Sequence, residues 1–456
     1  MFQFGDLRLG GADPAPAPPV GPVLPQAGHL VAHWDASAIP AQADNTALTS
    51  WTDRINGLVA AQATGVNQPI YREAEMNGRP CVQSSGSQWL SATSAGSALL
   101  AVLNTQIFSV LIVYQNIAVR TNGCLFGCTA GGNSLFYLAN GTRQGRFNAT
   151  ATGFSVPIES TGFTTLGGTS TTDQSGGAGS GLERIFVNGG CVASNVAPCP
   201  KPSASTDFGI FAGRGTGTFP SQGQIADILV WDVALTPAEM LQAERFVREK
   251  YGQPLPWEGQ PSFLVCHGDS QTAGVGGGNP ENGYPYQVAA TLGLKYGQWT
   301  QIGIGGINIT DMTTRALFEV DPISAATEIP TALAVFEWFN QRNNANSIVN
   351  TVAYLNARRS AGISKIVFGT SLDCTNTQDN LTNRANYNGY FDVTGNRAGI
   401  MDGYVAIHLD PNIGVEGSCP NASPWGDYFS DGIHCTPLGY VVLAGLFAPV
   451  VEDAMG

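Results

Sequence analysis

The stretch FLVCHGDSQTAG at residues 263–274 decides the fold of the C-terminal part of the chain. The apolar residues Phe263 to Cys266 are typical of a buried strand, and Gly268-Asp269-Ser270 follows as a sharp turn. Helix-like stretches and further apolar strands then alternate, at residues 286–294, 332–336, 348–361 and 365–370. This alternation predicts a parallel α/β sheet, in which active residues gather at the carboxyl ends of the strands.

Two short motifs supply the parts of a serine nucleophile site. Ser270 directly follows the first strand and precedes a Gly-rich loop, so it can sit at a helix N-terminus whose N–H groups face developing negative charge. Asp431 and His434 are three residues apart, which lets the carboxylate hold one ring nitrogen while the other takes the serine proton. Acyl transfer needs this combination together with donors for the oxyanion.

Residues 266–274, CHGDSQTAG, resemble the first sequence block of the SGNH (GDSL-like) hydrolases. Residues 431–434, DGIH, with Pro437, Gly439 and Tyr440 behind them, resemble the last block of that family. The second block of the family contributes a glycine amide to the oxyanion hole, and residues 301–310, QIGIGGINIT, are similar to it. The alignment points to Gly306, with a shift by one residue left open.

The third block departs from the family pattern. The family has Gly-x-Asn-Asp, whereas this chain has WFNQ at residues 338–341 after the strand Ala332–Phe336. The resemblance implies Asn340 as the side-chain donor to the oxyanion. Trp338 stands in place of the glycine, where it either lines the substrate cleft or caps the sheet.

The SGNH resemblance covers residues 261–456 and implies a flavodoxin-like α/β/α layered fold that needs no metal and no organic cofactor. It implies ester hydrolysis through an acyl-enzyme, with Ser270 as nucleophile, His434 as base and Asp431 holding His434. The amides of Ser270 and Gly306 and the side chain of Asn340 would bind the oxyanion.

The N-terminal half has a different rhythm, with short β segments separated by turns. Strands are predicted at residues 108–114, 182–187 and 224–231, and Asn188-Gly189 is a hairpin signal. Thr236 before Pro237 predicts a helix that runs to Lys250 and stops near Gly252. These features predict a β-sandwich closed by one helix, with Trp34 and Trp231 in its core.

Residues 30–36 (LVAHWDA), 51–54 (WTDR) and 77–80 (NGRP) resemble the opening of bacterial laminin-G-like, concanavalin-A-type domains. Later strands and the closing helix are also similar, so that the resemblance covers residues 28–252. It implies a jelly-roll sandwich of a family that often binds glycans. Two interpretations stay open: a carbohydrate-binding module, and a spacer that only orients the C-terminal domain.

The prolines mark the expected boundaries. Residues 1–27 are expected to be an N-terminal segment that contains a Pro/Ala tether. Three prolines between Gly252 and Pro261 predict a linker at residues 253–260.

Nine cysteines leave at least one unpaired; Cys191 with Cys199, and Cys374 with Cys419, could close small loops. No cysteine pair has the C-x-x-C spacing that is typical of zinc sites.

Composition narrows the partners and the location. The 456 residues carry a net charge of −13, which argues against a nucleic-acid partner, since phosphate binding needs a basic surface. We expect no membrane span, and we expect Tyr440–Val451 to be a buried terminal helix. The N-terminus has no secretory signal pattern. An extracellular or virion-associated protein, such as a phage tail adhesin, fits this pattern by analogy.

The leading hypothesis from the sequence is an esterase that removes O-acetyl groups from a polysaccharide. Two alternatives remain. One is a lipase-like or aryl esterase acting on small esters. The other is a glycan-binding adhesin whose hydrolase domain is inactive because its third block is altered. The oligomeric state stays open.

Overall fold

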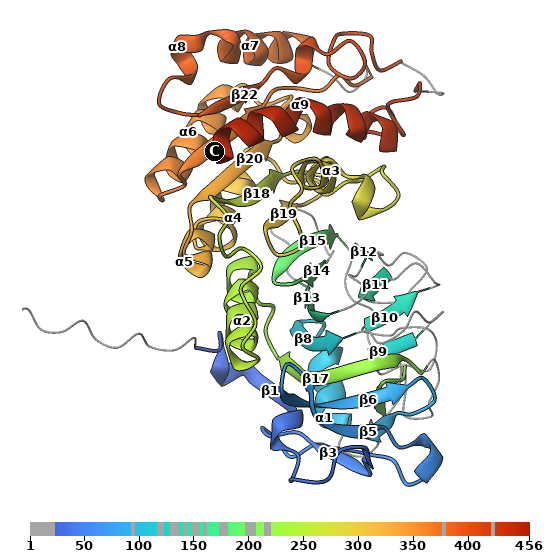
Figure 1. Cartoon of the computed structure of the whole chain (residues 1–456). Coiled ribbons are helices and arrows are strands. Elements are labelled where there is room, and N and C mark those ends of the chain that lie inside the picture. Colours follow the sequence, from blue (N-terminus) through green and yellow to red (C-terminus); the bar gives the residue numbers. More distant parts are fainter. Residues whose placement is uncertain are drawn as a thin grey trace, which may run out of the picture.

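A computed structural model describes residues 23–92, 96–115, 123–127, 136–139, 144–147, 156–157, 162–172, 181–196, 207–213, 220–375, 380–420 and 425–456. The Pro/Ala tether at residues 1–22 and the cysteines Cys128 and Cys199 lie outside the described residues. Figure 1 shows antiparallel sheets from the N-terminal half adjoining a parallel sheet with helices from the C-terminal half.

The N-terminal half forms two antiparallel sheets, here called sheet A and sheet B. Sheet A contains β1 (Leu30–Asp35), β2 (Thr46–Ala47), β5 (Ile70–Met76), β6 (Arg79–Ser85), β8 (Phe108–Gln115), β13 (Phe163–Thr171), β14 (Leu182–Val187), β15 (Gly190–Asn195) and β17 (Gln222–Trp231). Sheet B contains β3 (Ser50–Thr52), β4 (Val59–Ala61), β7 (Leu90–Ala92), β9 (Gly123–Gly127), β10 (Phe136–Ala139), β11 (Gln144–Phe147), β12 (Val156–Pro157) and β16 (Phe208–Ile210). The order in sheet A is β15-β14-β13-β8-β17-β6-β5-β2, with β1 on β17, which leaves β15 at an edge.

Sheets A and B pack against each other around a buried tryptophan. The Trp34 ring of β1 lies 5.1 Å from the Phe208 ring of β16 and 6.0 Å from the Phe126 ring of β9, measured between centroids. Trp34 and Trp231 are both fully buried, which confirms their predicted place in the core. The helix α1 (Gly96–Asn104) adds Leu99 and Leu103 to the same core.

The predicted hairpin and closing helix are both present. Asn188 and Gly189 have φ values of 52° and 82°, as a two-residue type I′ turn between β14 and β15 requires. Helix α2 (Pro237–Lys250) begins with a capping box. The Thr236 side chain accepts from the Glu239 amide, and the Glu239 carboxylate accepts from the Thr236 amide.

The C-terminal half is a three-layer α/β/α arrangement. Sheet C contains β18 (Phe263–Gly268), β19 (Trp299–Gly303), β20 (Thr331–Phe336), β21 (Lys365–Gly369) and β22 (Gly403–Val405), all parallel. Its order β19-β18-β20-β21-β22 is the 2-1-3-4-5 order of flavodoxin-like sheets. The helices are α3 (Tyr284–Thr291), α4 (Ile309–Glu319), α5 (Ile323–Thr327), α6 (Ser347–Ser360), α7 (Leu381–Asp392), α8 (Thr394–Arg397) and α9 (Pro437–Met455).

Alternate residues of β18 face the two helix layers. Leu264 and Cys266 share one apolar cluster with α3 and α9, whereas Phe263 and Val265 share another with α4, α5, α6 and α7. A strand that is apolar on both faces is typical of a parallel sheet covered on both sides. The chemistry-bearing residues are therefore left to the ends of the strands.

Helix α9 is longer than the sequence predicted. It has 19 residues and a mean hydropathy of 1.5, so by length and composition alone it could cross a membrane. One face of it, including Tyr440, Leu443 and Phe447, is buried against α3 and sheet C. This buried face agrees with the expected core helix.

Cys419 is a free thiol in the structure, so the expected Cys374–Cys419 disulfide is not formed. Its Sγ donates to the Gly432 carbonyl at 3.5 Å, and burial raises the pKa of the thiol to about 12. A protonated, packed thiol takes the place of a cross-link here. The Cys191–Cys199 pairing cannot be followed, because Cys199 lies outside the described residues.

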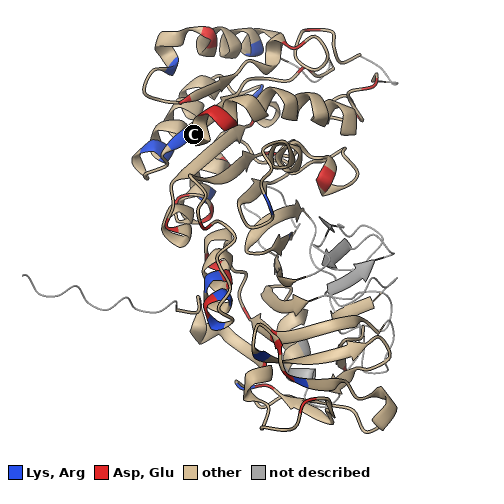
Figure 2. Ribbon diagram, viewed as in Figure 1, with Lys and Arg blue, Asp and Glu red and all other residues tan. Residues whose placement is uncertain are grey.

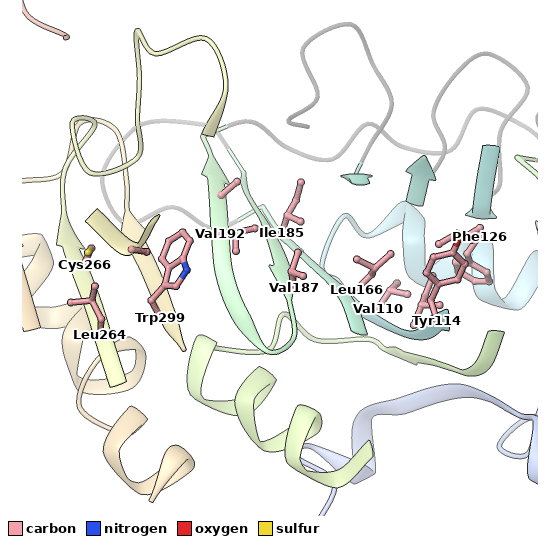
Figure 3. Packing of buried hydrophobic residues seen from close by; sticks show 14 of the residues in the cluster. Val110, Tyr114, Phe126, Leu166, Ile185, Val187, Val192, Leu264, Cys266 and Trp299 are labelled. Carbon is pink, nitrogen blue, oxygen red and sulfur yellow. The ribbon is translucent and has the colours of Figure 1, made fainter. Parts of the chain in front are cut away.

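The two halves are joined where the edge strands β15 and β19 meet. The Cys191 amide donates to the Thr300 hydroxyl at 3.0 Å, and a Cβ placed on Gly190 would lie 2.3 Å from the Trp299 carbonyl oxygen. Figure 3 shows Val192 of β15 beside Trp299 within one apolar cluster that continues into both halves. The proline-rich segment is docked as well, since Trp257 is 1% exposed and donates to the Thr327 carbonyl at 2.9 Å.

Ion pairs also cross this junction, in a molecule with few charged side chains (Figure 2). Arg184 of β14 binds Glu319 of α4 at 2.6 Å, and Arg315 binds the same carboxylate; all three side chains are at most 8% exposed. Burial raises the pKa of Glu319, but the two guanidinium groups outweigh it and lower that pKa overall. Arg245 of α2 pairs with Glu328 at 2.7 Å on the surface, where Glu328 is 70% exposed.

We expect Glu319→Ala to destabilise the full chain by about 3–5 kcal/mol, because two buried guanidinium groups would lose their shared carboxylate. Glu328→Ala is the matched control, with an expected loss below about 1 kcal/mol, because an exposed pair contributes little. Urea unfolding of the two variants and the wild type measures both values. Equal losses would show that the buried pair does not hold the junction.

Candidate active site

Ser270 lies at the carboxyl end of β18, the second strand of sheet C. The Oδ1 atom of Asp269 accepts from the Gln271 amide at 2.9 Å, and the Ala273 amide donates to the Asp269 carbonyl at 3.0 Å. These bonds close consecutive turns; the next helical residues are the 3-10 turn Pro280–Asn282, and the first α-helix is α3, which begins at Tyr284. The expected helix N-terminus behind Ser270 is therefore wrong: the Gly-rich stretch holds the chain in turns instead.

Ser270, His434 and Asp431 form one hydrogen-bonded series. His434 Nε2 is 2.9 Å from Ser270 Oγ, and His434 Nδ1 is 2.7 Å from Asp431 Oδ2. Exposure increases along the series, since Ser270 is 7% exposed and the side chains of His434 and Asp431 are 17% and 49% exposed. The hydroxyl is thus enclosed but reachable, beside a ring whose orientation is fixed by the carboxylate.

Asp431 is held ionised by its own loop. Partial burial raises its pKa, but the backbone and side-chain hydrogen bonds from His434 outweigh this and lower the pKa overall. Its Oδ1 also accepts from the Ile433 and His434 amides at 3.0 and 2.8 Å. Both carboxylate oxygens are therefore engaged, and the carboxylate stays a negative charge beside the imidazole.

Gln271 connects the serine turn to the histidine loop, and sequence reasoning did not single it out. Its Nε2 donates to the Ile433 carbonyl at 2.7 Å, and its Oε1 accepts from the Tyr440 hydroxyl at 3.1 Å. Gln271 is 3% exposed. The spacing between Ser270 and His434 is therefore set by a buried amide as well as by their own bond.

Two glycines allow the strand ends to close around Ser270. A Cβ placed on Gly303 would lie 2.2 Å from the Ala273 nitrogen, and one on Gly268 would lie 2.0 Å from the Phe336 carbonyl oxygen. Real Cβ atoms do not approach backbone atoms that closely, so side chains at either position would push the turn away. Gly303 thus allows the close packing of β19 against the nucleophile turn.

Gly306 follows this close contact with a φ of 82°, a conformation that favours glycine. A Cβ placed on the neighbouring Gly305 would lie 3.8 Å from Ser270 Cβ. Within the described ranges, the amides of Ser270 and Gly306 have no hydrogen-bond acceptor. The structure thus brings the Gly305–Gly306 segment next to the serine, and the choice between Gly305 and Gly306 as the oxyanion donor stays a prediction.

Asn340 joins three strand ends. It lies in the 3-10 turn Phe339–Gln341, after β20, and its Nδ2 donates to the Ile307 carbonyl at 2.9 Å and to Asp269 Oδ2 at 3.3 Å. Its backbone amide donates to Glu337 Oε1 at 3.0 Å. Both Nδ2 hydrogens are engaged, so the side chain must give up the longer bond to Asp269 before it can donate to an oxyanion.

Asp269 and Glu337 are two buried acids beneath the serine. Burial raises the pKa of Asp269 to about 6, while burial and the Asp269 charge raise that of Glu337 well above its usual value. Glu337 is 1% exposed, and its Oε2 has no partner among the described residues. Two neighbouring carboxyls in a low dielectric cannot both ionise readily, so at least one proton is retained.

Trp338 caps the sheet, one of the two roles that the sequence left open; a role in lining the substrate cleft stays a prediction. It is 2% exposed, and its ring packs 4.8 Å from the Tyr387 ring, which covers the end of the sheet. It also lines a small pocket together with Asp269, Gln271, Phe339 and Ile433. This pocket lies next to the serine turn and the histidine loop, but neither Ser270 nor His434 lines it, and it has room for no more than about one water molecule.

A second hydroxyl–histidine–carboxylate series lies elsewhere in the C-terminal half. His408 Nδ1 is 2.9 Å from Thr370 Oγ1, and its Nε2 is 3.1 Å from Asp392 Oδ2. Thr370 is 0% exposed, and its hydroxyl also lies 3.3 Å from the Val405 carbonyl. Because no substrate can reach a fully buried hydroxyl, this series is structural and provides a control for the exposed one.

His33, Asp35 and Asp227 are close enough together to suggest a cation site. The Lys250 ammonium lies among them, 2.7 Å from Asp35 Oδ1 and 2.8 Å from Asp227 Oδ1. Tyr251 also donates to Asp227 Oδ2 at 2.6 Å. A lysine thus supplies the positive charge that these carboxylates need, and the cluster binds α2 to β1 and β17.

No family model and no curated protein matches the chain. Among solved structures, a proposed acylhydrolase from Bacteroides fragilis is 18% identical, covers 47% of this chain and 98% of its own length, with a TM-score of 0.33. TesA is 17% identical, with 42% and 99% covered and a TM-score of 0.33. Domain 4 of the arabinanase AbnA from Geobacillus stearothermophilus, in complex with arabinotriose, is 15% identical, with 47% and 97% covered and a TM-score of 0.32. Likenesses of this size assign neither the fold nor the activity, which rest on the geometry above.

The buried acid predicts a pH dependence of stability. Since folding raises the pKa of Asp269 from about 3.8 to about 6, the folded chain binds the extra proton, and stability falls as pH rises between these values. In Asp269→Asn this decline should be smaller, as measured by urea unfolding from pH 4 to pH 7. Asp431→Asn is the control of opposite sign, followed from about pH 2 to pH 4, because a lowered pKa gives stability that is lost only as pH falls below 3.8. Identical profiles for Asp269→Asn and the wild type would contradict the prediction.

Proposed function

We propose that the chain is a serine ester hydrolase of the SGNH type, with its active site at residues 261–456. The observation that carries the proposal is the pair of bonds from His434 to Ser270 Oγ (2.9 Å) and to Asp431 (2.7 Å), next to unbonded amides. Ser270 and His434 are 164 residues apart in the chain, and they meet at the carboxyl edge of a parallel sheet, where such sheets place reacting groups.

The reaction follows from these contacts. His434 Nε2 takes the proton of Ser270 Oγ as the oxygen attacks the ester carbonyl carbon, and Asp431 stabilises the imidazolium. The Ser270 and Gly306 amides donate to the oxyanion, joined by Asn340 Nδ2 once it leaves Asp269. His434 then protonates the departing alkoxide, which leaves an acyl group on Ser270. A water molecule, deprotonated by His434, hydrolyses that ester and restores the serine.

We propose O-acetylated polysaccharide as the substrate class. Sheets A and B share a core and carry the predicted hairpin and closing helix, which supports a jelly-roll sandwich of the laminin-G-like type at residues 28–252. A glycan-binding surface in that sandwich would hold a polymer near the esterase. A virion or extracellular location remains part of this proposal.

One observation favours a second candidate, a glycan-binding protein with a silent hydrolase site. Both Nδ2 hydrogens of Asn340 are engaged with protein acceptors, and Trp338 and Gln341 replace the residues that the SGNH pattern has there. An oxyanion donor that stays bound to Asp269 would leave only the two amides. Turnover of a simple ester distinguishes the two candidates.

We expect Ser270→Ala and His434→Ala each to lower kcat for 4-nitrophenyl acetate by about four powers of ten or more, since the triad acts as a unit. His408→Ala is the matched control: it breaks the similar series at the buried Thr370 and should keep the wild-type kcat. Turnover that is equal in the wild type and Ser270→Ala would sink the esterase proposal.

We expect Asn340→Ala to lower kcat by about two to three powers of ten if its amide reaches the oxyanion. The same ester and steady-state kinetics test this. An unchanged kcat with a normal Ser270 dependence would mean that the two backbone amides suffice.

Acetate release from acetylated xylan, pectin and bacterial capsule, with Ser270→Ala as control, tests the substrate class. Release from at least one polymer at a higher kcat/KM than that for 4-nitrophenyl acetate supports the polysaccharide assignment. Hydrolysis of small esters alone would favour the lipase-like or aryl esterase instead.

A further inference from the structure

The strand β15 of sheet A ends beside the serine of the other half. The residue that follows it is Val196, and a Cβ placed on Gly305 would lie 3.7 Å from Val196 Cγ2 and 3.8 Å from Ser270 Cβ. The space above Gly305 is therefore bordered by Ser270 on one side and by a side chain of the N-terminal half on the other. Val196 is half-buried.

Ser194, two residues earlier, holds the end of β19. Its hydroxyl donates to the Gly303 carbonyl, and Gln301 Nε2 donates to Ser194 Oγ at 3.4 Å. Gln301 Oε1 in turn accepts from the Gly303 amide at 2.6 Å. Ser194 is 4% exposed, so these bonds form away from solvent, where an unmade bond is costly.

The segment after Gly303 is thus fixed from two sides. On one side, the Ile304 amide donates to the Gly268 carbonyl of β18 at 3.1 Å. On the other side, Ser194 holds Gly303. Gly305 and Gly306 follow immediately, so the direction of the proposed oxyanion amide depends on a side chain outside residues 261–456.

The junction gives β15 little freedom to move relative to β19. Gly190 has no room for a side chain against Trp299, the Cys191 amide is bound to Thr300, and Arg184 on the preceding strand is ion-paired in a buried site with Glu319. A displacement of sheet A would break these contacts together. Ser194 and Val196 therefore keep a fixed position over the active site.

We infer that the N-terminal half completes the active site: Ser194 is a positioning residue for the Gly305–Gly306 segment, and Val196 is a specificity-determining wall for the group bound at Ser270. The inference rests on the proposed esterase function. It makes the N-terminal half a part of the catalytic unit, in addition to any glycan binding elsewhere on its surface.

The positioning role is tested with Ser194→Ala in the full chain. Loss of the hydroxyl frees the Gly303 carbonyl, and we expect kcat for 4-nitrophenyl acetate to fall by about 10- to 100-fold with KM nearly unchanged, since small misplacements of catalytic groups have such costs. Ser194→Thr, which keeps a hydroxyl, should recover most of the lost kcat.

Ser170→Ala is the matched control for this test. Ser170 is also buried in sheet A, two strands away from β15, and its hydroxyl donates to the Gln106 carbonyl at 2.8 Å, so this bond does not touch sheet C. The two variants should lose similar stability in thermal unfolding, but Ser170→Ala should keep the wild-type kcat. Equal kcat values for the two variants, at a temperature where both are folded, would overturn the positioning role.

The specificity role is tested with Val196→Ala and Val196→Phe on 4-nitrophenyl esters from acetate to octanoate. We expect the alanine variant to raise the octanoate-to-acetate ratio of kcat/KM by about tenfold and the phenylalanine variant to lower it, as one or two methylene groups in a pocket allow. Val31→Ala, at another half-buried valine of sheet A, should leave the ratio unchanged.

The outcomes separate the two proposals. If the wild type does not exceed Ser270→Ala, the esterase function fails. If turnover depends on Ser270 but the Ser194 and Val196 variants behave like Ser170→Ala and Val31→Ala, only the role of the N-terminal half fails.

Discussion

The candidate site depends on the close approach of backbone at the carboxyl ends of β18, β19 and β20. Gly268 and Gly303 leave no room for a Cβ against Phe336 and the serine turn, so the three strand ends meet within backbone contact. Ser270, the Gly305–Gly306 segment and Asn340 each follow one of these ends. Any side chain at the two glycines would separate the nucleophile from its candidate oxyanion donors, because backbone cannot yield as a flexible side chain can.

The same geometry creates an electrostatic cost. Asp269 and Glu337 lie beneath the serine turn, and burial raises the pKa of both. Asp269 nevertheless contributes bonds to Gln271 and Asn340 that shape the turn and hold the amide of the third block. Two carboxyls with raised pKa values therefore lie within the hydrogen bonds that order the site, and such perturbed groups are common at functional sites.

Accessibility distinguishes the two hydroxyl–histidine–carboxylate series. The Thr370 series has similar distances, but its hydroxyl is completely enclosed, whereas Ser270 is partly exposed and lies beside unbonded amides. The contact between β15 and β19 adds a further difference between the two series, because Val196 and Ser194 of the N-terminal half lie against the Gly303–Gly305 segment beside Ser270. The surroundings of the two series therefore distinguish the candidate active site better than the distances within them.

The sequence by itself determined the local elements: the hairpin at Asn188-Gly189, the capped helix from Pro237 to Lys250, the strands that begin at Phe263 and Lys365, and the Asp431–His434 contact. Each is set by residues within a few positions, through φ preference, capping or side-chain period. Tertiary structure alone decided the two occupied hydrogens of Asn340, the role of Gln271 and the reach of Ser194 and Val196 into the other half. Those contacts join residues far apart in the chain, and their partners depend on how β15, β19 and the strand ends pack, which no local pattern encodes.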